Sequence, residues 1–221
     1  MTKTTNLSNG TNVMLPHHDT HIAKWVVQSG RLDHDQWLLP KLLPYLGRSV
    51  WDIGAYIGDH TVFYANNAQF VTAFEPNPIA YECLSFNLAR YHNTTCINAA
   101  LSDRNGMVGI VIAPNLGASH VTERTQNIPC LPADSIDAVD PSFIKIDAEG
   151  FEPRILRGAE RTIRTHKPTM LIEINKGALS RYEHSTDDIY ALLLSWGYEY
   201  RNINDGDHLN HEQFDLLCLP R

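Results

Sequence analysis

A short apolar run in the first part of the chain ends in two closely spaced glycines, Asp52-Ile-Gly54-Ala-Tyr-Ile-Gly58. The run, residues 49–53, has the composition of a buried strand, and a helical pattern follows from about Asp59. A strand, a glycine turn and a helix in this order begin a βαβ unit, and such units build a parallel sheet. Glycines in the turn let the backbone approach a ligand closely. The segment therefore predicts an α/β fold with a binding site where its first strand ends.

Short apolar runs continue to alternate with helical periodicity through the rest of the chain. Strands are expected at 49–53, 70–74, 95–100, 107–112, 143–146, 169–174, 198–203 and 214–219. Helices are expected at 59–66, from Asn77 to Tyr91, around 155–163 and at 185–196. The segment 114–132 is expected to be rich in loops. The last two strands are expected to run antiparallel, because Asn204-Asp-Gly-Asp between them has the composition of a turn.

The region before this pattern, residues 1–48, is expected to form a helical cover over one side of the site, with helices at about 20–30 and 34–45. Residues 49–221 are expected to form the main domain. No apolar run approaches the roughly 18 residues that a membrane-spanning helix needs, and residues 1–13 lack the apolar core of a signal peptide. The four cysteines form no CxxC pair, which favours free thiols in a reducing compartment. A cytoplasmic location is therefore expected.

An acid at the end of the second strand indicates that a nucleoside binds here. Glu75 closes that strand, and Asn77-Pro78 then begins a helix, with asparagine as the N-cap and proline at the first helical position. An acid at this place hydrogen-bonds the ribose hydroxyls of a bound nucleoside. The alternative is that the glycines only relieve crowding between strand and helix, and that Glu75 is a cap.

The charges near the glycine turn favour one class of nucleoside. NAD and ATP place a pyrophosphate on such a turn, and their motifs, G-x-G-x-x-G and G-x-x-x-x-G-K-[ST], are absent. Asp52 and Asp59 would repel a pyrophosphate, whereas S-adenosylmethionine has no phosphate and carries a positively charged sulfur. The net charge of −7, from 18 basic and 25 acidic residues, disfavours a nucleic-acid partner. These observations favour S-adenosylmethionine as the cofactor.

Longer stretches of the sequence resemble the FkbM-type methyltransferases, a branch of the class I S-adenosylmethionine-dependent enzymes. The stretches are VWDIGAYIGDHTVFYA (50–65), VTAFEPNP (71–78), AALSDRNG (99–106), APNLGASHV (113–121), FIKIDAEGFEPRILRGAERTI (143–163), PTMLIEIN (168–175) and FDLLCLP (214–220). Tyr56 departs from the family, which usually has asparagine there. The resemblance implies a Rossmann-like class I fold with α/β architecture. Its seven-stranded sheet would be mostly parallel, with an antiparallel last strand and helices on both faces.

The resemblance also implies which residues bind S-adenosylmethionine. They lie at the glycine turn and at the following strand ends, and they are Asp52, Gly54, Ala55, Tyr56, Gly58, Glu75, Pro76, Asn77, Ala100, Leu101 and Asp147. Glu75 would take the ribose hydroxyls, and Asn77 would lie close to the adenine. Asp147 would lie where the methyl donor meets the acceptor.

The candidates for catalysis are Lys145, Asp147 and Glu149, near the end of the strand that begins at 143. Strand alternation places Lys145 and Asp147 on the same face. Transfer of a methyl group to a hydroxyl needs a base within hydrogen-bond reach, and a carboxylate or a lysine can serve. The alternative for Lys145 is a structural ion pair with an acid such as Asp52 or Glu75, because a buried unpaired lysine is costly.

Residues expected to bind the acceptor are Glu173 and Asn175 at the end of the strand expected at 169–174, and Ser119 and His120 in a loop. With Asp147, the first two could hold Mg²⁺, because hard oxygen ligands suit that ion. Contacts with acceptor hydroxyls without a metal are favoured, so no metal site is predicted. The tryptophans expected in the core are Trp25, Trp37 and Trp51.

These features together predict an O-methyltransferase that acts on a hydroxyl of a sugar or another hydroxylated small molecule, the acceptor class being implied by the resemblance. Two alternatives stay open. An RNA 2′-O-methyltransferase would use a Lys-Asp-Lys-Glu tetrad, for which the chain offers, in order, Lys24, Asp147, Lys176 and Glu212. A catalytically inactive cofactor-binding module is the other alternative. The sequence carries no signal for an oligomeric state.

Overall fold

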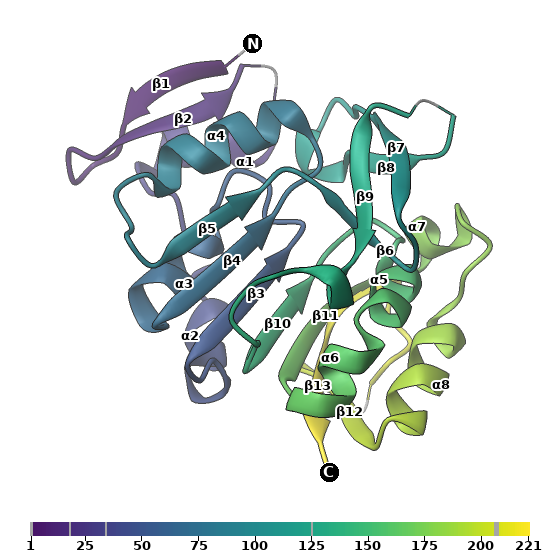
Figure 1. The fold of residues 1–221 in the computed structure, drawn as a ribbon. Coiled ribbons are helices and arrows are strands. Elements are labelled where there is room, and N and C mark those ends of the chain that lie inside the picture. Colours follow the sequence, from purple (N-terminus) through teal and green to yellow (C-terminus); the bar gives the residue numbers. More distant parts are fainter. Residues whose placement is uncertain (1, 18, 34, 125, 206–207) are drawn as a thin grey trace.

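The computed structural model describes residues 2–17, 19–33, 35–124, 126–205 and 208–221, and Figure 1 traces the chain. Its centre is a seven-stranded sheet in the order β12-β13-β11-β10-β3-β4-β5. The strands are β3 (Ser49–Ile53), β4 (Phe70–Phe74), β5 (Thr94–Ile97), β10 (Phe143–Ile146), β11 (Thr169–Asn175), β12 (Tyr198–Asn202) and β13 (Gln213–Pro220). Strand β13 pairs antiparallel with both neighbours, and the other pairs are parallel. The predicted α/β fold with an antiparallel last strand is confirmed.

Helices cover both faces of this sheet (Figure 1). They are α3 (Thr61–Asn67), α4 (Pro78–Leu88), α5 (Glu152–Gly158), α6 (Glu160–His166), α7 (Lys176–Ser180) and α8 (Thr186–Ser195). Successive residues of a strand point to opposite faces, so Val50 and Trp51 of β3 enter different cores. Val50 belongs to the core that contains Tyr64 of α3, and Trp51 to the core that contains Leu156 of α5. Burial on both faces explains why the strands appear in the sequence as short, nearly continuous apolar runs.

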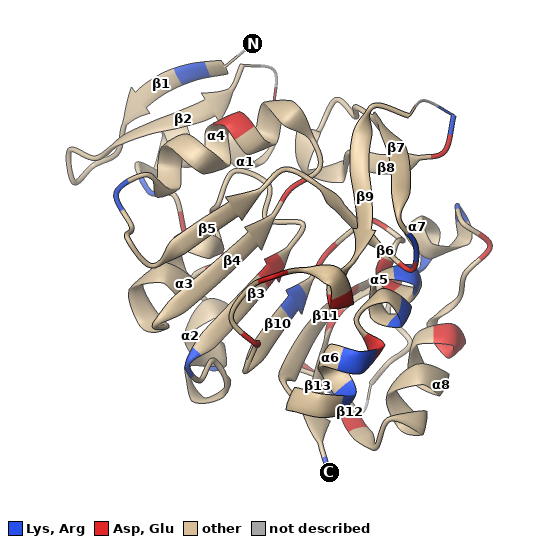
Figure 2. Cartoon of the chain, in the orientation of Figure 1, with Lys and Arg blue, Asp and Glu red and all other residues tan. Residues whose placement is uncertain are grey.

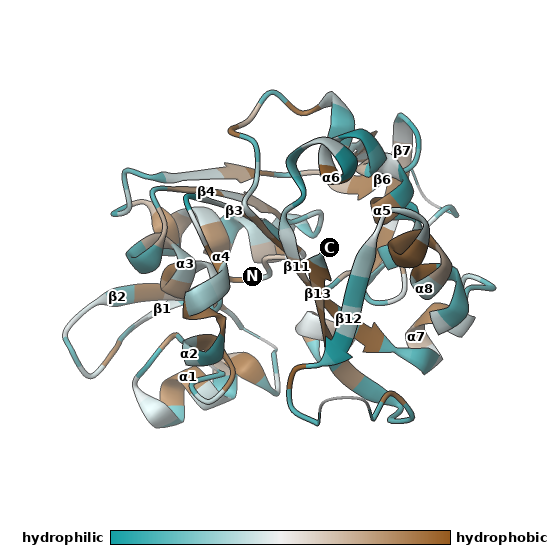
Figure 3. Cartoon of the chain, turned by 90° about the horizontal axis from the view of Figure 1, so that it is seen from below, coloured by the Kyte–Doolittle hydropathy of each residue, from teal (hydrophilic) through white to brown (hydrophobic). Residues whose placement is uncertain are grey.

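The sheet changes in polarity from its centre to one edge. Figure 3 shows that the edge strand β12 is largely hydrophilic, whereas its neighbour β13 is mostly apolar. A polar edge strand protects a sheet from pairing with another chain.

At the centre of the sheet, Lys145 of β10 is in register with Asp52 of β3, so a basic and an acidic position lie side by side inside the sheet (Figure 2). Removing two charges from water is costly, so a buried pair of this kind often serves a functional site, and Lys145 lines the cavity described below.

The segment between β5 and β10 forms a second, smaller sheet. It consists of β6 (Ala100–Ser102), β7 (Gly106–Val111), β8 (His120–Thr122) and β9 (Ile128–Pro132), in the order β6-β9-β7-β8. The strand near 107–112 was expected, but the prediction of loops over 114–132 is wrong for β8 and β9. Strand β8 has only three residues, and β9 contains prolines, which argue against a strand in the sequence. This sheet forms one wall of the cavity described below.

The described part of residues 1–48 begins with a hairpin of β1 (Thr2–Asn6) and β2 (Asn12–Pro16). The helices α1 (Ile22–Ser29) and α2 (Leu39–Leu42) follow, with a short 3₁₀ turn after α2. The expectation of helices alone missed this hairpin, because β1 reads Thr-Lys-Thr-Thr-Asn and has no apolar alternation. The second expected helix is much shorter than predicted, and residue 34, where it was to begin, lies outside the described residues. The boundary at residue 48 stays a prediction.

Asn87 of α4 anchors the hairpin to the main sheet's helical layer. Its Nδ2 donates to the carbonyl oxygens of Met14 (3.0 Å) and Ile57 (2.9 Å), and its Oδ1 accepts from Met14 N (2.7 Å). The side chain is completely buried, and its hydrogen bond with Ile57 forms away from water, whereas the two with Met14 are partly buried. Among the described helices, none combines the length and the apolar character needed to cross a bilayer.

Candidate active site

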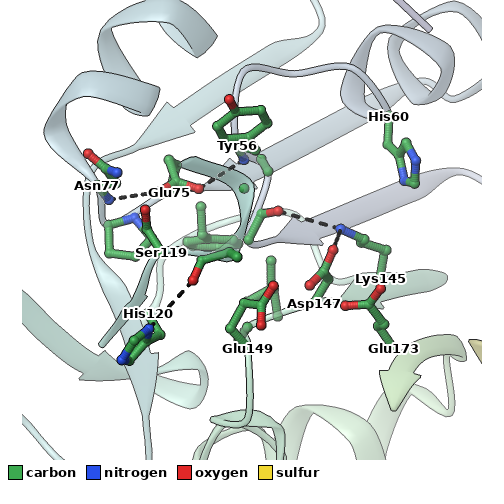
Figure 4. Close-up of a pocket in the computed structure, with 18 of the residues that line it drawn as sticks. Tyr56, His60, Glu75, Asn77, Ser119, His120, Lys145, Asp147, Glu149 and Glu173 are labelled. Atoms are coloured by element: carbon green, nitrogen blue, oxygen red, sulfur yellow. Dashed lines mark hydrogen bonds and ion pairs between the residues drawn. The ribbon is translucent and has the colours of Figure 1, made fainter. Parts of the chain in front are cut away.

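A cavity of about 490 Å³ opens at the carboxyl ends of β3, β4, β10 and β11 (Figure 4). Ligands bind at this edge of open α/β sheets. Most of the residues predicted from the sequence line it, namely Gly54, Ala55, Tyr56, Glu75, Pro76, Asn77, Ala100, Leu101, Ser119, His120, Lys145, Asp147, Glu149 and Glu173. Three predicted residues, Asp52, Gly58 and Asn175, do not line it. The chain therefore brings strand ends that are far apart in sequence around one space.

Glu75 is held rigidly at the end of β4. Its Oε2 accepts the backbone N–H of Tyr56 (2.9 Å), and its Oε1 accepts that of Asn77 (2.7 Å). Burial raises the pKa of Glu75 to about 7, although both hydrogen bonds act to lower it. Each carboxylate oxygen keeps a lone pair that can accept a further hydrogen bond from a molecule in the cavity.

Asn77 supplies a donor at the same end of the cavity. Its Oδ1 caps α4 by accepting from Ile79 N (3.1 Å), as the Asn-Pro pattern predicted. Its Nδ2 is buried and has no hydrogen-bond partner among the described residues. A buried amide without a partner is unfavourable, so this group is suited to a polar ligand atom.

The glycine turn touches the end of β10. Gly54 has φ +81°, and a Cβ at this position would lie 1.7 Å from the carbonyl oxygen of Asp147. Only glycine allows this approach. Tyr56 has φ +50°, a conformation that asparagine tolerates better than tyrosine. Gly58 was expected to line the ligand site, but a Cβ there would meet Leu84, so this glycine serves the packing of the turn against α4.

Asp52 also differs from its predicted role. Its side chain is completely buried beneath the floor of the cavity, and its Oδ2 accepts from Thr61 Oγ1 (2.6 Å). Lys145 Nζ lies 4.0 Å from Asp52 Oδ1 and 3.0 Å from Asp147 Oδ2. Burial lowers the pKa of Lys145, but the charges of Asp147 and Asp52 outweigh it and raise that pKa well above its ordinary value. Lys145 is therefore charged at neutral pH.

Three carboxylates converge beside Lys145. Oxygen atoms of Asp147, Glu149 and Glu173 all lie within 4.8 Å of one another. Burial acts to raise the pKa of Asp147, but the Lys145 charge and a hydrogen bond with Glu173 lower it. The charge of Asp147, together with burial, raises the pKa of Glu173 well above its ordinary value. Within this pair, Asp147 is therefore the group that ionises more readily, and Glu173 is the group that holds a proton more firmly.

Glu149 has a different environment within this cluster. Burial, followed by the charge of Asp147, raises the pKa of Glu149 to about 7. Its backbone has φ +52°, and Arg181 donates to its carbonyl oxygen (3.0 Å). The group can therefore exchange a proton near neutral pH, which suits a general base.

The remaining predicted acceptor residues divide into two groups. Ser119, directly before β8, and His120, the first residue of β8, both line the cavity (Figure 4). Burial, with the nearby charge of Arg181, lowers the pKa of His120. Asn175 instead caps α7, because its Oδ1 accepts from Ala178 N (3.1 Å), and it does not line the cavity.

Further residues line the cavity that the sequence did not predict, among them His60, Asp35 and Trp37. His60, just before α3, places Nε2 2.8 Å from Oδ2 of Asp35 in the N-terminal segment, and Asp35 also lines the cavity. Trp37 was expected in the core, yet its side chain is 58% exposed and lines the cavity. No motif or periodicity links these positions in the sequence, since the fold alone joins the two segments. Trp51, by contrast, is 2% exposed and lies in the core as predicted.

Comparison with solved structures identifies the class of fold. Among solved structures, a TehB-like SAM-dependent methyltransferase from Corynebacterium glutamicum matches with a TM-score of 0.54 and 11% identity, covering 90% of this chain and 94% of that one. SMU.1697c from Streptococcus mutans, solved in complex with SAH, matches with a TM-score of 0.54 and 11% identity, covering 83% and 96%. The sheet order and the cavity at its carboxyl edge are those of the class I methyltransferase fold.

The sequence identifies the family. The methyltransferase FkbM domain matches residues 52–200, so this chain belongs to the FkbM methyltransferase family, as predicted. A methyltransferase FkbM from Methylobacillus flagellatus KT is 24% identical with a TM-score of 0.56, over 78% of this chain and 43% of that one. The hexuronic acid methyltransferase AglP of Haloferax volcanii is 29% identical over 136 residues, which are 58% of this chain and 56% of that protein. The chain spans about half the length of these relatives.

Proposed function

We propose that this chain transfers a methyl group from S-adenosylmethionine to a hydroxyl of a carbohydrate-like small molecule. The observation that carries the proposal is one cavity with two distinct ends. At one end Glu75 is fixed by two backbone N–H groups, and at the other Asp147 and Glu149 lie beside Lys145. The relative whose name specifies a hexuronic acid supports a sugar acceptor.

The end of the cavity around Glu75 is suited to the nucleoside part of the cofactor. Glu75 would accept the ribose hydroxyls, Asn77 Nδ2 would donate to the adenosine part, and Ala100 and Leu101 would border the adenine. The Gly54 turn would lie along the methionine part, where its backbone leaves room. When bound, S-adenosylmethionine supplies a methyl group on a positively charged sulfur.

The acidic end is suited to hold and deprotonate a hydroxyl. Asp147, kept ionised by Lys145, would accept the hydroxyl hydrogen bond and orient the oxygen. Glu149, whose pKa burial raises to about 7, would take the proton near neutral pH. Lys145 would act through Asp147, because its own proton is firmly held.

We propose that this reaction needs no metal ion. The carboxylates of Asp147, Glu149 and Glu173 offer hard oxygen ligands. However, the Lys145 ammonium lies 3.0 Å from Asp147 and offsets its charge, and the raised pKa of Glu173 favours a proton on that group. Lys145 and the proton that Glu173 favours would both oppose the binding of a metal ion at this cluster.

The alternative of RNA methylation finds no support in the geometry. Lys24, Lys176 and Glu212, which would complete a tetrad with Asp147, do not line the cavity. The excess of acidic residues over the whole chain also opposes binding to a polyanion.

The experiment is a methyl-transfer assay with a panel of neutral sugars, amino sugars, hexuronic acids and capped RNA, followed by mass spectrometry of each product. We expect a methyl ether on a sugar hydroxyl, at the same rate with and without EDTA. Asp147→Asn should abolish transfer while S-adenosylmethionine still binds. Binding without transfer to any acceptor would favour an inactive module, and transfer to RNA alone would overturn the proposal. A rate that falls in EDTA and returns with Mg²⁺ would overturn the metal-free mechanism.

A further inference from the structure

Trp37 is unusual among the exposed apolar side chains of the described residues. At 58% it is the most exposed of the large ones, and none of the others lines the cavity. An exposed tryptophan loses the free energy that burial would provide. Its place at the rim of a ligand cavity therefore points to a ligand that covers it.

The backbone around Trp37 is firmly held. Leu38 N and Leu39 N both donate to the carbonyl oxygen of Asp35, at 3.0 and 2.9 Å, and both leucines are buried. The Nζ of Lys41 lies over the indole ring, 5.2 Å from its centroid. The backbone turn at Trp37 is fixed by these hydrogen bonds, and Lys41 packs on the indole ring. The exposed indole surface is therefore already positioned before a ligand binds.

Trp37 belongs to the acceptor end of the cavity. Asp35, two residues earlier, contacts His60 Nε2 at 2.8 Å. Figure 4 shows His60 extending from its helix toward the side where Lys145, Asp147 and Glu173 converge. Asp215, which also lines the cavity, is in register with Glu173 on the neighbouring strand.

We propose that Trp37 is the platform on which an uncharged sugar ring of the acceptor stacks, an inference that rests on the proposed function. A pyranose ring has an apolar face of C–H groups that packs on an indole, and hydroxyls around its edge that bind carboxylates. Asp35, Asp215 and Glu173 supply such oxygens in the same cavity. Lys145 is paired with Asp147, and the Lys41 ammonium over the indole donates to Asn204 Oδ1 (3.0 Å). The carboxylates that line this end, Asp35 and Asp147, would repel a sugar carboxylate. A neutral ring is therefore preferred over a hexuronic acid.

The test uses methyl glycosides of glucose, galactose, mannose and rhamnose, with methyl glucuronide as the acidic probe. For the best neutral glycoside, Trp37→Ala should raise KM about tenfold, with kcat and the affinity for SAH unchanged. Trp37→Phe should keep KM within about threefold, because the ring remains. Leu194→Ala, an exposed apolar residue outside the cavity, is the matched control and should behave as the unaltered chain.

A second readout reports stacking directly. The glycoside should change the tryptophan fluorescence of the unaltered chain, and Trp37→Phe should remove this change while transfer continues. An unchanged KM in Trp37→Ala, or a preference for methyl glucuronide over every neutral glycoside, would overturn this inference and leave the proposed methyl transfer standing. Lack of transfer to any sugar by the unaltered chain would instead overturn the proposed function, and the stacking role with it.

Discussion

The ammonium of Lys145 lies 3.0 Å from the carboxylate of Asp147, at the point where β10 reaches the cavity. The same ammonium is 4.0 Å from the fully buried Asp52. One cation therefore faces two carboxylates, one below the cavity floor and one inside the cavity. Lys145 therefore combines the two roles considered for it in the sequence, a structural ion pair and a part in catalysis. The ion pair with Asp147 also keeps that carboxylate charged.

Replacing Lys145 by methionine should destabilise the protein. The change keeps the bulk of the side chain but leaves Asp52 and Asp147 without a counter-charge, and breaking a buried pair in this way costs about 3–5 kcal/mol. Urea unfolding measures the loss. Lys24→Met, at an exposed position of α1, is the control and should change the free energy of unfolding by less than about 0.5 kcal/mol. Equal stability of the two variants would contradict the ion pair.

Glu75→Ala should weaken the binding of SAH. The ribose hydroxyls would lose their acceptor, at a cost on the order of 1–3 kcal/mol, and isothermal titration calorimetry measures it directly. Glu82→Ala, on the exposed side of α4, should bind as the unaltered chain does. If both variants bind equally well, Glu75 does not contact the ribose.

We expect Glu152 to support stability and activity through its hydrogen bonds and not through a negative charge. Its Oε1 accepts from Ala148 N (2.9 Å) and Gly150 N (3.1 Å), so it holds the loop that carries Glu149. Burial raises the pKa of Glu152 to about 7, which means that a neutral group is tolerated there. Glu152→Gln should therefore keep stability and kcat, whereas Glu152→Ala should lose about 2 kcal/mol of stability and most activity. Equal behaviour of the two variants in thermal melting and rate assays would refute this role.

Asn87→Ala should loosen the hairpin. The substitution removes three hydrogen bonds and leaves backbone groups of Met14 and Ile57 without these partners, at a cost of about 2–3 kcal/mol. Hydrogen exchange should show faster exchange of the Met14 amide. Asn66→Ala, an exposed position of α3, is the control and should leave exchange in β2 unchanged. Protection that survives in Asn87→Ala would argue for another anchor.

Stability should fall as the pH rises from 5 to 7.5. Burial raises the pKa of Glu75, Glu149 and Glu152 from an ordinary 4.5 to about 7, and that of Asp215 from 3.8 to about 6. Between the ordinary and the raised values, the folded chain binds more protons than the unfolded chain, so the free energy of unfolding decreases with pH. Thermal melting without cofactor should show a Tm several degrees lower at pH 7.5. The variant with both Glu149→Gln and Asp215→Asn should show a flatter profile, and a Tm that rises over this range would contradict the buried acids.

The central sheet and the cofactor end of the cavity could be predicted because each depends on local patterns. Apolar runs located all seven strands, and the glycine turn, Glu75 and the Asn77 cap lie within one βαβ unit. The small sheet was only partly predicted, since prolines in β9 obscure its pairing.

The acceptor end was harder to predict because it depends on contacts between distant segments. Asp35 and His60 meet only in the fold, and the exposure of Trp37 cannot be deduced from its apolar character. Asn175 shows the opposite error, because a polar residue at a strand end caps the next helix. A polar side chain at a strand end can bind a ligand in the cavity or a nearby backbone group. The sequence pattern does not show which of these two partners it takes.

The contact between Gly54 and the carbonyl oxygen of Asp147 has a consequence for reaction geometry. Strands β3 and β10 are adjacent in the sheet, and the close approach of the Gly54 backbone to this oxygen fixes the spacing between the glycine turn and the end of β10. The distance that a methyl group would travel is then set by backbone spacing. One methyl group at position 54 would force these two strand ends apart, so in the proposed reaction the backbone sets the distance between the methyl donor and the acceptor.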